Sequence, residues 1–175
     1  MSSLDIYRGA KVVVTGHTGF KGSWLITWLK QLGAIVSGVS IDVPSEPSHY
    51  NSAKLYDQVD DYRIDIRDNN ELKLIIKKIQ PDFVFHLAAQ ALVRPSYNSP
   101  FDTITTNAIG SVSVLDVLRT LDKPVVAVMI TSDKAYDNVE WIWGYREVDR
   151  LGGKDPYSAS KGMAELAIRS YVESF

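Results

Sequence analysis

Apolar runs of strand type alternate with apolar patterns of helical period along almost the whole chain. The first run, residues 12–14, is β-branched and leads through three glycines into residues at the three- and four-residue spacing of one helix face: Trp24, Leu25, Trp28, Leu29 and Leu32. This pattern predicts a strand, a tight loop and a helix that ends near Gly33.

The alternation continues to the end of the sequence. It predicts further strands over residues 34–41, 62–66, 82–89 and 125–130, and helices over 71–79, 100–121 and 158–170. Asp68 with Glu71 forms a capping-box-like start for the second helix, and Ser99 followed by Pro100 starts the third. The stretches 44–54 and 90–98, and the segment before the last helix, are predicted to be loops.

Alternating strands and helices are typical of an α/β fold. We therefore predict one doubly wound parallel sheet over residues 1–175, a Rossmann fold with strand order 3-2-1-4-5 and flanking helices. In that order the winding reverses between strands 1 and 4, so the glycine loop, the Ala88–Ala89 strand end and the end of strand 5 should open onto one crevice. Ligand chemistry is expected there.

Composition and charge narrow the class of protein. The 175 residues are 45% hydrophobic and 23% charged with a net charge of -2, as in ordinary globular proteins, and no basic patch suggests a nucleic-acid partner. The absence of cysteine excludes disulfides, thiolate zinc sites and a catalytic thiol, and the three scattered histidines suggest no metal site. The sequence shows neither an apolar signal core nor a membrane-length apolar run, so a cytoplasmic protein is expected.

The glycine loop suggests a phosphate site. Glycines at 16, 19 and 22 would let a ligand approach the backbone, and the amides at the helix start would face a pyrophosphate. The alternative is an ordinary strand-to-helix turn. Asp42 lies 20 positions after Gly22, where dinucleotide folds place a carboxylate for the ribose hydroxyls, and it would favour NAD over NADP. Asp42 could equally be a solvated strand end, and so could Asp65–Ile66, which would otherwise contact the adenine.

Tyr157 and Lys161 are spaced to share one face of the last helix. A phenol has a reference pKa of about 10, and nearby cations lower it. A decrease of about 3 units corresponds to roughly 4 kcal/mol, which a lysine and an oxidised nicotinamide could supply together. The alternative for this pair is a solvated helix face.

Together these residues resemble a known family. Thr15-Gly16-x-x-Gly19-x-x-Gly22, Asp42, Leu87-Ala88-Ala89, Asn107 and Tyr157-x-x-x-Lys161 are similar to the extended short-chain dehydrogenase/reductases, which include nucleotide-sugar epimerases and dehydratases. The strings Gly16–Trp24, Thr131–Lys134 and Trp141–Glu147 resemble the CDP-glucose 4,6-dehydratases within that family. Related dehydratases usually carry Asp-Glu where this chain has Asp133-Lys134.

The resemblance implies NAD as cofactor and CDP-glucose as substrate, with no nucleic acid, membrane or metal partner. Arg94 and Ser96, with Tyr97 beside them, would contact the substrate, although a plain surface loop is the equal alternative. The implied cofactor-binding residues are Gly16, Thr18, Gly19, Phe20, Lys21, Gly22, Asp42, Asp65, Ile66, Leu87, Ala88, Ala89, Gln90, Asn107, Thr131, Tyr157 and Lys161.

The resemblance also implies a catalytic sequence. Tyr157 would remove the C4 hydroxyl proton while hydride passes to NAD, Ser132 would hydrogen-bond that oxygen, and Lys161 would hold the nicotinamide ribose. Lys134 would then take the C5 proton and Asp133 would protonate the departing C6 hydroxyl before hydride returns to C6. The net reaction is a dehydration, a lyase step of deoxysugar biosynthesis such as that for lipopolysaccharide O-antigen. The alternative for Ser132–Lys134 is a polar strand-to-loop junction, and Asn107 is expected to order the backbone.

Several features depart from the family pattern. Ala135 and Met163 replace frequent cysteines, Ala91 replaces a common proline, and family members continue for about as many residues again into a substrate-binding part that this sequence lacks. Two other interpretations therefore stay open: another extended short-chain dehydratase or epimerase, and an NAD-binding fragment without turnover of its own. Family dimers pair the two long helices, so a homodimer through residues 100–121 and 158–170 is expected.

Overall fold

The computed structural model describes residues 3–175 and contains one parallel five-stranded sheet in the order β3-β2-β1-β4-β5. The strands are β1 Lys11–Thr15, β2 Ile35–Ser40, β3 Asp60–Arg63, β4 Phe83–His86 and β5 Val126–Met129. Every neighbouring pair is parallel, and the register places Val14 between Gly38 and Phe85. The predicted fold class and strand order are confirmed.

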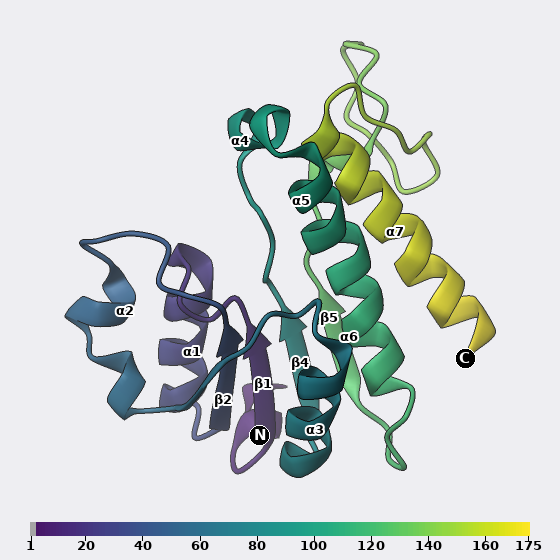
Figure 1. Ribbon diagram of the computed structural model, residues 1–175. Coiled ribbons are helices and arrows are strands. Elements are labelled where there is room, and N and C mark those ends of the chain that lie inside the picture. The colour runs from purple at the N-terminus through teal and green to yellow at the C-terminus, as the bar shows by residue number, and fades with distance from the viewer. Residues whose placement is uncertain (1–2) are drawn as a thin grey trace. The chain divides into compact units, whose positions relative to one another are not determined.

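Helices connect the strands (Figure 1). They are η1 Ser3–Tyr7, α1 Phe20–Gln31, α2 His49–Ser52, η2 Leu55–Asp57, α3 Asn69–Ile79, α4 Val93–Asn98, α5 Pro100–Ile104, the π-helical η3 Thr105–Ile109, α6 Gly110–Leu118, η4 Asp133–Ala135 and α7 Pro156–Ser174. Right-handed crossovers place α1 and α3 on opposite faces of the sheet, because the chain moves outward from β1 to β2 and back from β3 to β4.

The chain forms two compact units, which are described separately below. The first contains the residues up to Ala88 and Asp116–Ile130, and therefore holds the whole sheet. The second contains Ala89–Leu115 and Thr131–Phe175, and holds α4, α5, η3, η4 and α7. No helix in residues 3–175 combines the length and apolarity needed to cross a membrane.

The core of the first unit lies between β1 and α1. Val12 and Val14 are fully buried, as expected of a central strand covered on both faces, and Ile26 and Leu29 of α1 pack in the same cluster. In contrast, Val126 and Val128 on the edge strand β5 are exposed.

Three predicted element boundaries are wrong. The third strand spans Asp60–Arg63 instead of 62–66, and two of the three segments predicted to be loops contain an α-helix: α2 lies within 44–54 and α4 within 90–98. Ser48 caps α2 by accepting from the Asn51 amide at 3.1 Å. Tyr50 of α2 is buried in the core of the first unit, so tertiary packing stabilises a helix too short to show a periodic pattern.

The two long predicted helices also differ in detail. The helix predicted over 100–121 ends at Leu118 and contains the π-helical turn at 105–109. The last helix is longer than the predicted 158–170, because Asp155 caps it and Pro156 occupies its first turn.

Candidate functional site

The glycine loop of the first unit connects β1 to α1. Gly16 has a φ of 72°, and a Cβ there would lie 2.7 Å from the Ala88 nitrogen. A Cβ on Gly22 would lie 2.1 Å from the Gly16 oxygen. Both glycines are thus required by close backbone packing, which draws the loop against the end of β4 and against its own helix.

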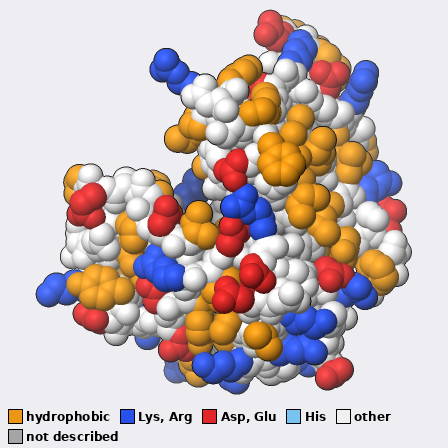
Figure 2. All heavy atoms as spheres, in the orientation of Figure 1, with side chains coloured by type: hydrophobic (Ala, Val, Ile, Leu, Met, Phe, Trp, Pro, Cys, Tyr) orange, Lys and Arg blue, Asp and Glu red, His pale blue; other side chains and the backbone are white. Residues whose placement is uncertain are grey.

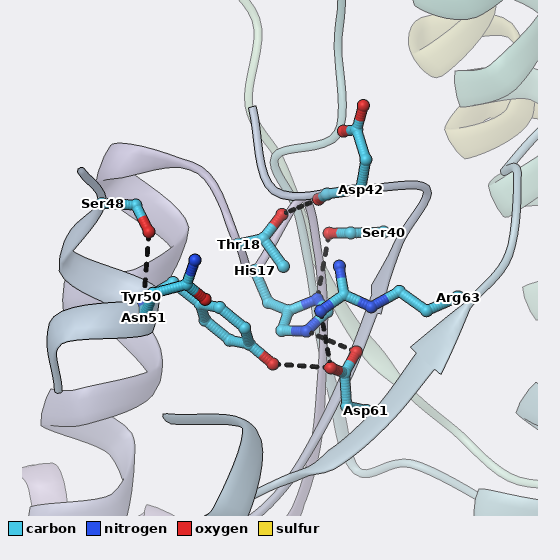
Figure 3. Close-up of polar contacts among 9 residues, drawn as sticks. All are labelled: His17, Thr18, Ser40, Asp42, Ser48, Tyr50, Asn51, Asp61 and Arg63. Carbon is cyan, nitrogen blue, oxygen red and sulfur yellow. Dashed lines mark hydrogen bonds and ion pairs between the residues drawn. The ribbon is translucent and has the colours of Figure 1, made fainter. Parts of the chain in front are cut away.

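The start of α1 is suited to an anion. Gly19 is the N-cap residue and has no side chain to satisfy the first amides of the helix, which remain for an external acceptor. Thr18 donates a 2.6 Å hydrogen bond to the Asp42 carbonyl, so the loop is tied to the chain just beyond β2. The Asp42 carboxylate is exposed and points away from the neighbouring polar side chains (Figure 3). Helix amides with a nearby carboxylate are the donor and acceptor set that a dinucleotide requires.

The glycine loop contains a buried histidine, His17, whose ring is held by two polar side chains. The His17 Nδ1 lies 3.0 Å from the Ser40 hydroxyl, and Nε2 lies 3.0 Å from Asp61 Oδ1 (Figure 3). Burial lowers the pKa of His17 more than the facing Asp61 raises it, so the ring is neutral near pH 7. Because a carboxylate only accepts, Nε2 carries the proton and Nδ1 accepts from Ser40.

Asp61 connects three elements. Besides His17, it accepts from the Tyr50 hydroxyl at 2.7 Å and from the Arg63 guanidinium at 2.7 Å. Burial and this carboxylate raise the pKa of Tyr50 well above its ordinary value. The sequence pattern predicts none of these partners; the available signal is a histidine inside the glycine loop, since a buried imidazole needs two partners.

The end of β4 and the Asp65–Ile66 pair have different surroundings. The Thr15 hydroxyl lies 2.7 Å from His86 Nδ1 and accepts from the Ala88 amide at 3.2 Å, which fixes the strand end beside Gly16.

The Asp65 carboxylate pairs with Arg67 at 2.6 Å, and hydrogen bonds from that guanidinium lower the Asp65 pKa. Ile66 is buried.

Asn107 is the central polar residue of the second unit. Its side chain accepts from the Gln90 amide at 2.8 Å, and donates to the Gln90 carbonyl at 3.0 Å and to the Ser160 hydroxyl at 2.9 Å. Asn107 is 1% exposed and lies in the π-helical turn, a distortion often found at functional sites. These contacts fit the predicted ordering role, because they tie the segment after Ala89 to α7.

Tyr157 and Lys161 lie at the start of α7, whose N-cap Asp155 accepts from the Ser158 amide at 2.9 Å and its hydroxyl at 2.6 Å. Both predicted residues are buried, and the Lys161 ammonium lies 6.0 Å from the centre of the Tyr157 ring. Burial lowers the pKa of Lys161, while the Glu165 carboxylate raises it.

Ser132, Asp133 and Lys134 lie in the same unit, and η4 packs on α7. The Ser132 hydroxyl donates to Asp133 at 3.1 Å and accepts from the Lys134 amide at 3.2 Å, which forms a tight turn. Asp133 and Lys134 are exposed, so both are open to a substrate. Thr131, just before the turn, donates its hydroxyl hydrogen to Glu165.

The two predicted substrate residues differ. Arg94 is exposed and lines a pocket of about 670 Å³. Ser96 is fully buried and donates to the Val93 carbonyl at 2.6 Å, so its hydroxyl is already used within α4.

Across residues 3–175 no group of histidine and carboxylate side chains could hold a metal ion.

The sequence of this chain is similar to those of known proteins. The chain is 47% identical to the CDP-glucose 4,6-dehydratase of Salmonella typhimurium over 175 residues, which are all of this chain and 49% of that relative. The chain spans about half the length of the curated relatives it matches.

Solved structures show the same fold. The UDP-glucose 4-epimerase of Thermotoga maritima with UDP-glucose has a TM-score of 0.83 at 25% identity, covering 94% of this chain and 52% of that one. The Thermus thermophilus UDP-glucose 4-epimerase in complex with NAD has a TM-score of 0.80 at 27% identity, covering 94% and 51%. The family model described as GDP-mannose 4,6 dehydratase matches residues 13–175, and the chain belongs to this family of extended short-chain dehydrogenase/reductases.

Proposed function

We propose that this chain carries the cofactor-binding and acid–base residues of an NAD-dependent 4,6-dehydratase that converts CDP-glucose to CDP-4-keto-6-deoxyglucose. The observation that carries the proposal is the packing of the turn with Asp133 and Lys134 on the helix that presents Tyr157 and Lys161. The 47% identity to a CDP-glucose 4,6-dehydratase supports the choice of nucleotide.

NAD, when bound, supplies a reversible hydride acceptor for the sugar. The amides at the start of α1 would hold its pyrophosphate, and the exposed Asp42 carboxylate would accept from the adenosine ribose hydroxyls. Lys161 would hold the nicotinamide ribose, and Arg94 would contact the substrate. The 4-epimerase of Thermus thermophilus, a structural relative, was solved with NAD.

The first proton transfer is assigned to Tyr157. Its phenolate would take the C4 hydroxyl proton, and the buried ammonium of Lys161 would stabilise that phenolate. Ser132 would hydrogen-bond the same oxygen. Oxidation at C4 produces a ketone, which acidifies the neighbouring C5–H bond.

The elimination is assigned to the pair that follows. Lys134 would take the C5 proton, the released electron pair would form the C5–C6 double bond, and Asp133 would protonate the C6 oxygen as its bond breaks and water leaves. In this division of roles the Lys134 side chain accepts a proton and the Asp133 side chain donates one.

An epimerase is the second candidate, because both solved relatives described above are 4-epimerases. Epimerisation needs Tyr157 and Lys161 but no acid–base pair for elimination. A third candidate is an NAD-binding unit without turnover, since the chain spans about half of its relatives.

We also propose a homodimer through the helices of the second unit. Phe101, Ile109, Met163 and Leu166 are each about half exposed or more, and hydrophobic side chains run along this part of the surface (Figure 2). An apolar stripe of this kind on α5, η3 and α7 is typical of a protein interface.

The first prediction separates the candidates. With NAD and CDP-glucose, the protein is expected to form a 4-keto-6-deoxy sugar nucleotide, detected by mass spectrometry as a loss of water, and to be slower with UDP- or dTDP-glucose. A preference for another nucleotide contradicts the cytidine assignment, and an isomeric product without loss of water indicates an epimerase. NAD binding by calorimetry with no product supports the unit without turnover.

The second prediction concerns Lys134. Lys134→Ala should slow product formation by about 100-fold or more, as expected for removal of a general base, while the affinity for NAD is retained. Lys154→Ala is the matched control, because Lys154 is also exposed in the same unit and should leave the rate unchanged. An unaltered rate for Lys134→Ala would remove this residue from the mechanism.

The third prediction concerns assembly. Sedimentation equilibrium should show a dimer that Leu166→Glu shifts to monomer, because a carboxylate would be buried in the interface. Leu74→Glu changes a leucine on α3 that is 70% exposed, against 57% for Leu166, and should leave the dimer intact. A wild-type monomer, or a dimer indifferent to Leu166→Glu, would contradict the proposed interface.

A further inference from the structure

One carboxylate of the second unit lies beside both groups of proposed catalytic residues. Glu165 follows Lys161 by one turn of α7 and accepts a hydrogen bond from the Thr131 hydroxyl, 34 positions away in the sequence. Thr131 directly precedes the turn that carries Ser132, Asp133 and Lys134. The contact therefore connects the start of this turn to the catalytic helix.

Lys161 needs such a neighbour. Its side chain is only 6% exposed, and Glu165 follows it one helical turn further along α7. Burial lowers the pKa of Lys161, and the Glu165 carboxylate is the charged group that raises it. A buried ammonium without an opposing charge tends to lose its proton.

We propose that Glu165 is a positioning residue with two effects: its carboxylate holds the acid–base turn against α7 through Thr131, and, one helical turn beyond Lys161, it places a negative charge beside that side chain. The inference rests on the proposed function, since it assigns Glu165 a role in that same reaction. Pattern analysis named Thr131 as a cofactor residue and did not name Glu165.

The other titratable groups around Lys161 do not replace this carboxylate. On α7 itself the ring of Tyr157 faces the ammonium, with its centre 6.0 Å away. The described elements packed on α7 carry these further titratable groups: Asp133 and Lys134 on η4, Arg94 and Tyr97 on α4, and Asp102 on α5. Among all of these groups, Glu165 alone shifts the pKa of Lys161.

A second glutamate on the same helix provides a contrast. Glu173 lies two turns further on, is 63% exposed and pairs with Arg169 at 2.8 Å, as a solvent-facing i, i+4 pair does. Glu165 is half-buried and bonds to a residue of a distant segment instead. Glu173→Gln is therefore a matched control for Glu165→Gln.

The two effects are separated by two variants. Glu165→Gln keeps an oxygen that accepts from Thr131 but removes the charge, so the loss of activity at alkaline pH should begin about one pH unit lower. The direction follows because Lys161 would deprotonate at a lower pH. Thr131→Val keeps the charge and removes the hydrogen bond, so kcat should fall about tenfold with the alkaline limb unmoved, and Thr131→Ser should restore the rate.

The assay measures product formation from CDP-glucose against pH, with NAD affinity measured by calorimetry over the same pH range. Calorimetry reports the Lys161 charge without turnover, because NAD binding to Glu165→Gln should weaken at a lower pH than binding to wild type. Glu173→Gln should match wild type in both measurements. Identical alkaline limbs for Glu165→Gln and Glu173→Gln would overturn the inference.

A further measurement tests the contact independently of activity. Chemical denaturation measures the free energy of unfolding of each variant. The double variant Thr131→Val/Glu165→Ala should be no less stable than the less stable of the two single variants, because both substitutions break the same hydrogen bond. Fully additive losses would contradict the contact. If wild type neither binds NAD nor forms product, the proposed function fails; if wild type does both and Glu165→Gln behaves as wild type, only the Glu165 inference fails.

Discussion

The close approach of backbone at the glycine loop is the constraint on which the first unit depends. Gly16 lies against Ala88, and Gly22 lies against Gly16, at distances that no side chain would permit. This contact sets where β1 stops, where α1 begins and which amides are left at its start. Thr18 then fixes the backbone of Asp42 relative to those amides, so the geometry of the proposed pyrophosphate site follows from packing that the fold requires in any case.

In the second unit, polar side chains hold distant segments of the chain against one helix, α7. Asn107 ties the Gln90 backbone to Ser160, and Glu165 ties Thr131 to the next turn of the same helix. Lys161 lies between these two contacts in the sequence of α7 and Tyr157 lies just before them, and both side chains are buried. Polar side chains therefore help to position the groups that would move protons.

The sequence predicts well whatever depends on local periodicity. This is true of β1, of α1 and of the spacing of Tyr157 and Lys161. The apolar pattern of a helix or strand shows which of its positions are buried. Features that depend on distant partners were missed. β3 begins with two aspartates, a poor strand pattern, and the Asp61 carboxylate is held there by His17 of the glycine loop, Tyr50 of α2 and Arg63 of β3 itself. Likewise the spacing of Lys161 and Glu165 is visible in the sequence, while the contact with Thr131 is not.

The central claim is that the glycine loop and the start of α1 bind NAD. Nuclear magnetic resonance of the isotope-labelled protein during an NAD titration tests it most directly. The account predicts that the amide signals of Gly19–Gly22 shift as NAD is added and follow one dissociation constant. Unchanged signals for Gly19–Gly22 at saturating NAD would contradict it.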